Sequence, residues 1–192
     1  MTDQSERASW LRLDNEANPV PAIAAMWAES KKRLGYVREF LKLPIEGDRL
    51  SLFQGYVNRL MRSDDCLLSG QERELVALVA SLENQCEACI VTHAGALQAH
   101  GMAKRTIDVV LCNWRRADLT DREMAMARFA SHLTVHPQEA TEAELDRLRD
   151  AGLREDELLE IVQIVAIFNA TNRLNAGLGV KVDGGAFDAF RS

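Results

Sequence analysis

The stretch Glu83-Asn84-Gln85-Cys86-Glu87-Ala88-Cys89-Ile90-Val91-Thr92-His93 decides how the rest of this 192-residue chain is interpreted. It holds a C-x-x-C pair, Cys86 and Cys89, with His93 four residues after the second cysteine. On a helix, residues at i and i+4 share a face, so His93 could exchange a proton with the Cys89 thiol. Backbone N–H groups and the positive end of the dipole favour a thiolate at a helix N-terminus. The spacing therefore predicts a redox pair at the start of a helix that faces a cavity.

The composition indicates a globular protein of one domain. Apolar residues make up 47% and charged residues 27%, and the formal net charge of -6 gives no sign of a nucleic-acid partner. The first seven residues do not resemble a signal peptide. The longest apolar run, from Leu158 to Ala170, is interrupted by polar residues and is too short to span a bilayer. We therefore expect a cytoplasmic protein without a membrane partner, in which the four cysteines provide a redox pair or a metal site.

Helix signals recur along the chain, and strand signals are nearly absent. Asn18-Pro19 predicts the start of the first helix, and Gly35 its end. Capping boxes, each a serine or threonine followed three residues later by glutamate, predict three further helix starts at Ser69, Thr120 and Thr141. The expected helices cover about 19–34, 48–62, 70–82, 86–100, 104–114, 121–133, 142–151 and 155–175, with a short turn over 36–41 that ends at Pro44. We predict an all-α, single-domain, multi-helix bundle over 1–192, with terminal arms at 1–17 and 178–192 and a loop or extended tail after Gly177.

A helix break at Glu83-Asn84 brings a carboxylate to the thiols. If the helices on either side fold back as an antiparallel hairpin, residues equally far from the break face each other, which places Glu74 opposite His93. A buried carboxylate in that place can hold an imidazole in one tautomer and pass protons through it. In this relay His93 helps to ionise Cys89, which attacks an oxidant. Cys86 then resolves the sulfenic acid to a disulfide.

These residues resemble the alkylhydroperoxidase D and carboxymuconolactone decarboxylase superfamily. The match rests on Leu68-Ser69, Glu72-Arg73-Glu74 and Cys86-x-x-Cys89-x-x-x-His93, and on Phe168 to Leu174, which is similar to the last helix of a peroxidase-related branch. It extends from roughly Pro19 to Gly179. The resemblance implies an all-helical fold, homo-oligomers (trimers or hexamers), and a thiol-dependent peroxidase or disulfide reductase without haem, flavin or metal. Its partners would be a small hydroperoxide and a dithiol or protein-disulfide electron donor.

Carried over residue by residue, the resemblance implies that Cys89 is the peroxidatic cysteine and Cys86 the resolving one. Glu74 and His93 would form the relay. The chain departs from alkylhydroperoxidase D between the cysteines, where a further histidine is replaced by Glu87-Ala88. A Glu87 carboxylate that points inward would oppose thiolate formation and slow the peroxidase reaction. The decarboxylase branch generally lacks the cysteine pair, which argues against lactone decarboxylation.

Two other interpretations of the pair remain open. Cys86, Cys89, His93 and His100 share a helical stripe and offer zinc two sulfurs and two nitrogens, although one straight helix cannot wrap four ligands tetrahedrally. The pair could also form a disulfide that alters assembly in a non-catalytic redox sensor. Two cysteines this close in one helix constrain little at a distance, which counts mildly against that role.

The remaining chemically active residues are interpreted as structural. His100 is expected to compensate the dipole at a helix C-terminus, His132 and His136 to lie on the surface, and Cys112 to pack beside its apolar neighbours. Polar groups on an apolar helix must be satisfied, so the side chains near the end of the last helix either cap neighbouring backbone groups, which we expect, or reach a partner subunit. These side chains are Asn169, Asn172 and Arg173.

Overall fold

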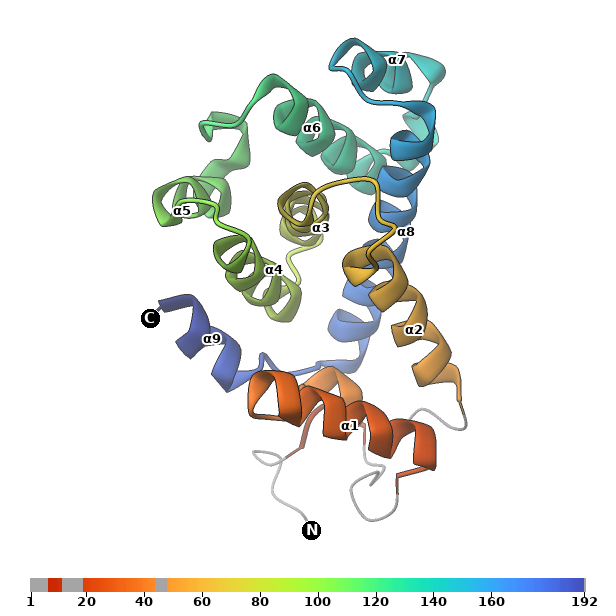
Figure 1. Cartoon of the computed structure of the whole chain (residues 1–192), viewed down its shortest axis with the longest axis vertical. Helices are drawn as coiled ribbons and strands as arrows, with labels where there is room; N and C mark the ends of the chain where they lie inside the picture. Colours follow the sequence, from red (N-terminus) through yellow and green to blue (C-terminus); the bar gives the residue numbers. More distant parts are fainter. Residues whose placement is uncertain (1–6, 12–18, 44–47, 192) are drawn as a thin grey trace.

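The computed structural model describes residues 7–11, 19–43 and 48–191, and within these ranges the chain is helical and contains no strand (Figure 1). The elements are α1 (Pro21–Leu34), η2 (Glu39–Lys42), α2 (Arg49–Arg62), α3 (Gly70–Glu83), α4 (Glu87–Ala99), α5 (Lys104–Asn113), η3 (Trp114–Arg116), α6 (Asp121–Val135), η4 (Pro137–Glu139), α7 (Glu142–Asp150), α8 (Glu155–Leu178) and α9 (Gly184–Arg191). The predicted all-α bundle is confirmed. None of these helices is both long and apolar enough to cross a bilayer.

Helix α3 lies at the centre of the bundle (Figure 1). It packs against α4, α6 and α8, and every residue from Arg73 to Ser81 is buried. A helix that is apolar on most sides is stable only when neighbours cover all of its faces. Burial of one leucine, such as Leu75 or Leu78, stabilises the fold by about 1.5–3 kcal/mol. The core of the protein is therefore built around the helix that carries Glu74.

Capping boxes set the starts of the helices that surround the site. At the start of α3, the Ser69 backbone N–H donates to Glu72 Oε2 (2.8 Å) and the Glu72 N–H donates to Ser69 Oγ (3.2 Å). The same reciprocal pattern is present at Thr120, as predicted. At the predicted start Thr141, the backbone N–H and the hydroxyl both donate to Glu144 Oε2 (2.9 and 2.6 Å). Loss of one such cap typically costs about 1 kcal/mol of stability.

The chain reverses between α3 and α4 at the predicted break. Asn84 is the C-cap of α3, and its backbone N–H donates to the carbonyl oxygen of Ala80 (3.1 Å). Gln85 follows with φ of 53°, in the left-handed region that non-glycine residues seldom adopt. This reversal lays α4 back along α3, which places the cysteine helix against the most buried helix of the fold.

The first helix begins two residues later than predicted. Helix α1 starts at Pro21, and Val20 is its N-cap with ψ of 152°. The residue before a proline is pushed out of the helical region, so Val20 cannot continue a helix from Pro19. Asn18 and Pro44, to which the prediction gave capping and terminating roles, lie outside the described residues. The predicted end at Gly35 is confirmed, with φ of 82°.

The C-terminal segment is helical, and the prediction of a loop or extended tail after Gly177 was wrong. Helix α8 continues to Leu178, and α9 follows and packs against α4. The glycines that suggested a loop serve other purposes. Gly179 ends α8 in the left-handed conformation, with φ of 59°. Gly185 lets the Tyr36 ring approach, since a Cβ there would lie 2.3 Å from that ring.

Candidate active site

The two cysteines lie at the start of α4, as predicted. Cys86 is the N-cap residue and Cys89 belongs to the first turn. Both residues are buried, with 4% and 3% of their surface exposed, and both thiols are free. A thiol in such a place contacts the unsatisfied backbone N–H groups of the first turn. The geometry therefore allows a disulfide between two sulfurs one turn apart.

Hydrogen bonds place the first negative charge of the pair on Cys86. The Cys89 thiol donates to the Cys86 sulfur, and this bond, with the Cys89 backbone N–H and the Asn175 amide, lowers the pKa of Cys86 to about 7 against the opposing effect of burial. The same thiol–thiol bond, together with burial, raises the pKa of Cys89. Cys86 is therefore the first of the two thiols to ionise, and the Cys89 thiol stays protonated beside it. The sequence-based relay had placed the ionised sulfur on Cys89.

Glu74 and His93 meet where the hairpin argument placed them. His93 Nδ1 lies 2.6 Å from Glu74 Oε2, and the two residues are 5% and 7% exposed. The Phe168 ring stands edge-on to the imidazole, with centroids 4.4 Å apart at 88°. The carboxylate and the ring fix the orientation of His93 and leave its Nε2 as the nitrogen available for proton transfer.

These residues surround one small cavity of about 60 Å³, and Cys86 does not line it. The lining residues are Arg38, Phe40, Phe53, Gln54, Val57, Met61, Arg62, Glu74, Cys89, Thr92, His93, Ala96, Phe168, Thr171 and Asn175. We call this space the reaction cavity. It admits only a few water-sized groups. A small reactant that enters it meets the Cys89 sulfur before that of Cys86.

Asn175 is a site residue that the sequence analysis missed. Its Nδ2 lies 3.1 Å from Cys89 Sγ and 3.7 Å from Cys86 Sγ. The residue is 6% exposed, and its Oδ1 is buried without a hydrogen-bond partner in the described part of the chain. Asparagines recur every third residue on α8, at Asn169, Asn172 and Asn175, and this pattern was the available signal.

The first two asparagines have the expected structural role. Asn172 contacts Ser81 Oγ (3.3 Å) and donates to the carbonyl oxygen of Ala80 (3.4 Å). Asn169 Oδ1 accepts from Asn84 Nδ2 at 3.1 Å. These bonds tie α8 to the end of α3 and so hold Asn175 over the cysteines.

Two residues that bore on competing interpretations lie away from the thiols. Glu87 is exposed, and its charge is the weakest of the influences on the pKa of Cys86. His100 is at the other end of α4, where its ring covers Gly70 so closely that a Cβ there would lie 2.3 Å away. Across the described ranges, no three His, Cys, Asp or Glu side chains are grouped as metal ligands. The proposed zinc set therefore lacks the geometry it requires.

The predicted burial of Cys112 and the predicted surface position of His132 were wrong. Cys112 is exposed, because α5 buries Ile107, Val110 and then Trp114, and a residue five positions after Ile107 points away from that face. His132 is half-buried, and its Nε2 is buried without a partner among the described residues. His136 is exposed, as predicted.

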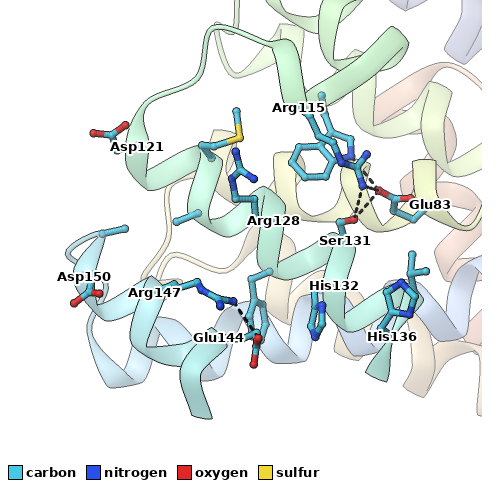
Figure 2. Close-up of a pocket in the computed structure, with 16 residues that line it drawn as sticks. Glu83, Arg115, Asp121, Arg128, Ser131, His132, His136, Glu144, Arg147 and Asp150 are labelled. Carbon is cyan, nitrogen blue, oxygen red and sulfur yellow. Dashed lines mark hydrogen bonds and ion pairs between the residues drawn. The ribbon is translucent and has the colours of Figure 1, made fainter. Parts of the chain in front are cut away.

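A larger cavity, of about 910 Å³, lies along α6 and α7 and contains none of the predicted site residues (Figure 2). Two ion pairs lie along it. Glu83 Oε1 accepts from Arg115 (3.2 Å) and from Ser131 Oγ (2.7 Å), and Arg147 contacts Glu144 at 3.0 Å (Figure 2). No thiol lines this space.

Comparisons with known proteins agree with this arrangement. The sequence profile of the carboxymuconolactone decarboxylase family matches residues 50–132, a range that includes Glu74, Cys86, Cys89 and His93. A search of curated proteins found no match.

Two solved structures are similar over nearly the whole chain. An uncharacterized peroxidase-related protein from Ralstonia eutropha JMP134, described as an alkylhydroperoxidase AhpD core, is 28% identical with a TM-score of 0.81, over 91% of this chain and 96% of the other. An uncharacterized peroxidase-related protein from Silicibacter sp. TM1040 is 26% identical with a TM-score of 0.89, over 100% of both chains. The debrominase Bmp8 in complex with 2,3,4-tribromopyrrole, 16% identical with a TM-score of 0.77 over 95% and 98%, shares the fold.

Proposed function

This chain belongs to the alkylhydroperoxidase D and carboxymuconolactone decarboxylase superfamily, in its peroxidase-related branch, and from that premise we propose that it is a thiol-dependent peroxidase. It reduces small hydroperoxides with Cys89 and Cys86 and takes electrons from a dithiol, either a small molecule or the reduced form of a disulfide protein. One observation carries the proposal. The Cys89 sulfur lines a small cavity beside the His93–Glu74 pair, and a second sulfur lies within hydrogen-bonding reach behind it.

The first step is attack by Cys89 on the terminal oxygen of the hydroperoxide. An S–O bond forms and the O–O bond breaks, so that sulfur is oxidised and the peroxide is reduced to an alcohol. The Cys89 proton passes along its existing hydrogen bond to the Cys86 thiolate. The departing alkoxide takes a proton from His93, which Glu74 holds in place. Asn175 Nδ2 fixes the attacking sulfur, and its free Oδ1 is available to the peroxide O–H.

The second step forms the disulfide. Cys86 attacks the sulfenic sulfur of Cys89, an S–S bond replaces the S–O bond, and the hydroxide leaves as water with the proton that Cys86 had received. A dithiol then attacks the disulfide and is itself oxidised to a disulfide. Its two protons restore the Cys89 thiol and the proton that His93 gave to the alkoxide, and Cys86 is again a thiolate. Overall one hydroperoxide and one dithiol give an alcohol, water and one disulfide.

The proposal extends to compartment and assembly. Such a cycle needs a pool of reduced thiols, which favours the cytoplasm. Large apolar side chains are exposed at Leu52 (65%), Tyr56 (43%) and Leu159 (60%), on the neighbouring helices α2 and α8. Leu52 is near the end of α8, where Leu50 packs with Leu174 and Leu178. Leu159 is near the start of α8, so the exposed side chains form no single patch. The homo-oligomer is therefore proposed from the family resemblance alone.

The test is peroxide-dependent oxidation of dithiothreitol by the wild type and by single cysteine variants. We expect Cys89→Ser to lower turnover by on the order of 10³-fold or more, since the attacking group is lost. Cys86→Ser should consume about one equivalent of peroxide and then stop, because its sulfenic acid cannot be resolved. Cys112→Ser removes an exposed thiol and is the matched control, with unchanged turnover.

One outcome would contradict the proposed peroxidase. If wild type and both variants are equally inert, while the wild type still forms and exchanges the Cys86–Cys89 disulfide, the protein is an electron carrier or a redox sensor and not a peroxidase.

A further inference from the structure

A second cavity opens beside the reaction cavity. It has a volume of about 620 Å³, lies between α1 and α2, and shares Arg38, Gln54 and Arg62 with the reaction cavity. The shared residues form the boundary between the two spaces. A molecule bound in the larger space can therefore extend its reactive end past that boundary toward Cys89.

The second cavity is strongly basic, and we call it the arginine cavity. Arg33, Arg38, Arg59 and Arg62 line it, and among the described residues Glu29 is the one carboxylate in its lining. The chain as a whole carries a net charge of -6, so this concentration of cations runs against the composition. A cavity of one sign in an acidic protein attracts ligands of the other sign.

Two of the four arginines are neutralised by carboxylates outside the cavity. Arg38 Nε lies 3.4 Å from Asp183 Oδ2, and Arg59 contacts Asp65 Oδ2 at 2.5 Å. The other two have no such partner. Within residues 7–11, 19–43 and 48–191, neither Arg33 nor Arg62 forms an ion pair.

The unpaired guanidinium groups repel one another. Loss of water around the group, followed by the charges of Arg33 and Arg38, lowers the pKa of Arg62 to about 10. Desolvation and the charge of Arg38 also lower the pKa of Arg33. Arg62 does bond to Asn58 Oδ1 at 2.7 Å, but a neutral amide does not balance its charge. With Glu29 included, the described residues of the lining keep a single uncompensated positive charge.

We propose that the arginine cavity binds a carboxylate on the small molecule that reacts at Cys89, so that the preferred reactant is a monoanion. This inference rests on the function proposed above. A guanidinium group binds a carboxylate through two parallel hydrogen bonds. Arg33 and Arg62, which form no ion pair with any described residue, have guanidinium groups available for such a contact. One excess positive charge matches a carboxylate better than a doubly charged phosphate. The carboxylate belongs either to the hydroperoxide or to the dithiol donor.

The test compares reactants that differ only in that charge. The first pair is cumene hydroperoxide with a para-carboxylate and the methyl ester of the same compound, with dithiothreitol as donor. The second pair is dihydrolipoate and dihydrolipoamide, with the methyl ester as oxidant. We expect the wild type to favour the anion of one pair by about 10-fold or more in kcat/KM, from the strength of charge-assisted hydrogen bonds. The preferred pair identifies the source of the carboxylate.

Variants connect the preference to the cavity. Arg62→Gln and Arg33→Gln should each remove most of the preference, mainly through KM. Arg33 does not line the reaction cavity, so Arg33→Gln should also leave the rate with the neutral reactants unchanged. Arg105→Gln is the control, because Arg105 is exposed on α5 and lines neither cavity. The inference is overturned if neither pair shows a preference, or if the preference survives in both cavity variants.

Binding gives the same test without turnover. Titration calorimetry with 4-isopropylbenzoate, which has no peroxide, should show binding to the wild type and a loss of about 10-fold in affinity in Arg62→Gln. No binding of this anion would overturn the inference. Turnover with the neutral ester alone would leave the proposed peroxidase intact and refute only the carboxylate site. Binding of the anion without any peroxide turnover would support the carboxylate site and refute the proposed peroxidase.

Discussion

The two cavities, of about 910 Å³ and 60 Å³, differ in the arrangement of their polar groups as well as in size. In the larger one, along α6 and α7, Arg115 is paired with Glu83 and Arg147 with Glu144 (Figure 2). In the reaction cavity, a thiol and an imidazole–carboxylate pair converge, whereas no thiol lines the larger one. Each cavity is lined by one residue with a buried atom that has no partner among the described residues, Asn175 Oδ1 in the first and His132 Nε2 in the second.

The difference shows where chemistry is expected in this fold. Charges that are already paired at a partly open surface mainly contribute to structure, and each such pair contributes little to stability. A nucleophile that shares a cavity with a buried acid–base pair held by its neighbours can act on a reactant. Volume alone would have directed attention to the α6–α7 cavity.

A glutamate-to-glutamine substitution in each cavity should give the largest difference in peroxide turnover. Glu74→Gln should lower peroxide turnover by about 10²–10⁴-fold, because His93 loses the carboxylate that supports proton transfer. Glu144→Gln, on the larger cavity, should leave turnover within about twofold, since a glutamine can keep the capping box at Thr141. Steady-state assays with one peroxide and one dithiol measure both.

Two readouts separate a positioning role of Glu74 from a general loss of structure. The circular dichroism spectrum of Glu74→Gln should match that of the wild type, and the loss should fall on kcat more than on KM. Equal losses in Glu74→Gln and Glu144→Gln would remove the distinction between the two cavities.

A smaller effect is expected in the titration of the thiols. In a Cys66→Ser, Cys112→Ser background, absorbance at 240 nm should report one thiolate with a pKa of about 7, which belongs to Cys86. Because this pKa is lowered, the thiolate and the peroxidase activity are present above about pH 7 and are lost as the pH falls below it. Asn175→Ala removes a hydrogen bond to the sulfurs and should move the titration to higher pH.

The structure gives the lower pKa to Cys86, whereas the sequence-based relay placed the thiolate on Cys89, and a further variant distinguishes the two. Adding Cys86→Ser to the same background should abolish the titration near pH 7. If it persists there, the low pKa belongs to Cys89, and the hydrogen bond between the sulfurs runs the other way.

Local signals made most of the fold predictable. The capping boxes at Ser69, Thr120 and Thr141 place three helix starts correctly, because each depends only on residues three positions apart. The contact of Glu74 with His93 followed from equal distances to one helix break. Such contacts are predictable because, in two consecutive antiparallel helices, the position of the break alone decides which residues face each other.

Features that depend on distant elements could not be predicted in this way. Asn175 lies 86 residues after Cys89, and only the packing of α8 against α3 brings it to the sulfurs. The direction of the thiol–thiol hydrogen bond depends on that amide and on burial. Helix α9 was hidden by glycines that are needed for close packing, as at Gly185.

The central claim is that peroxide oxidises Cys89 first, within the reaction cavity. The most direct measurement treats Cys86→Ser with one equivalent of cumene hydroperoxide and dimedone, which traps sulfenic acids, and maps the adduct by mass spectrometry. The account predicts one adduct, on Cys89, and its loss in Cys86→Ser, Cys89→Ser. An adduct on the exposed Cys112 with none on Cys89 would contradict it.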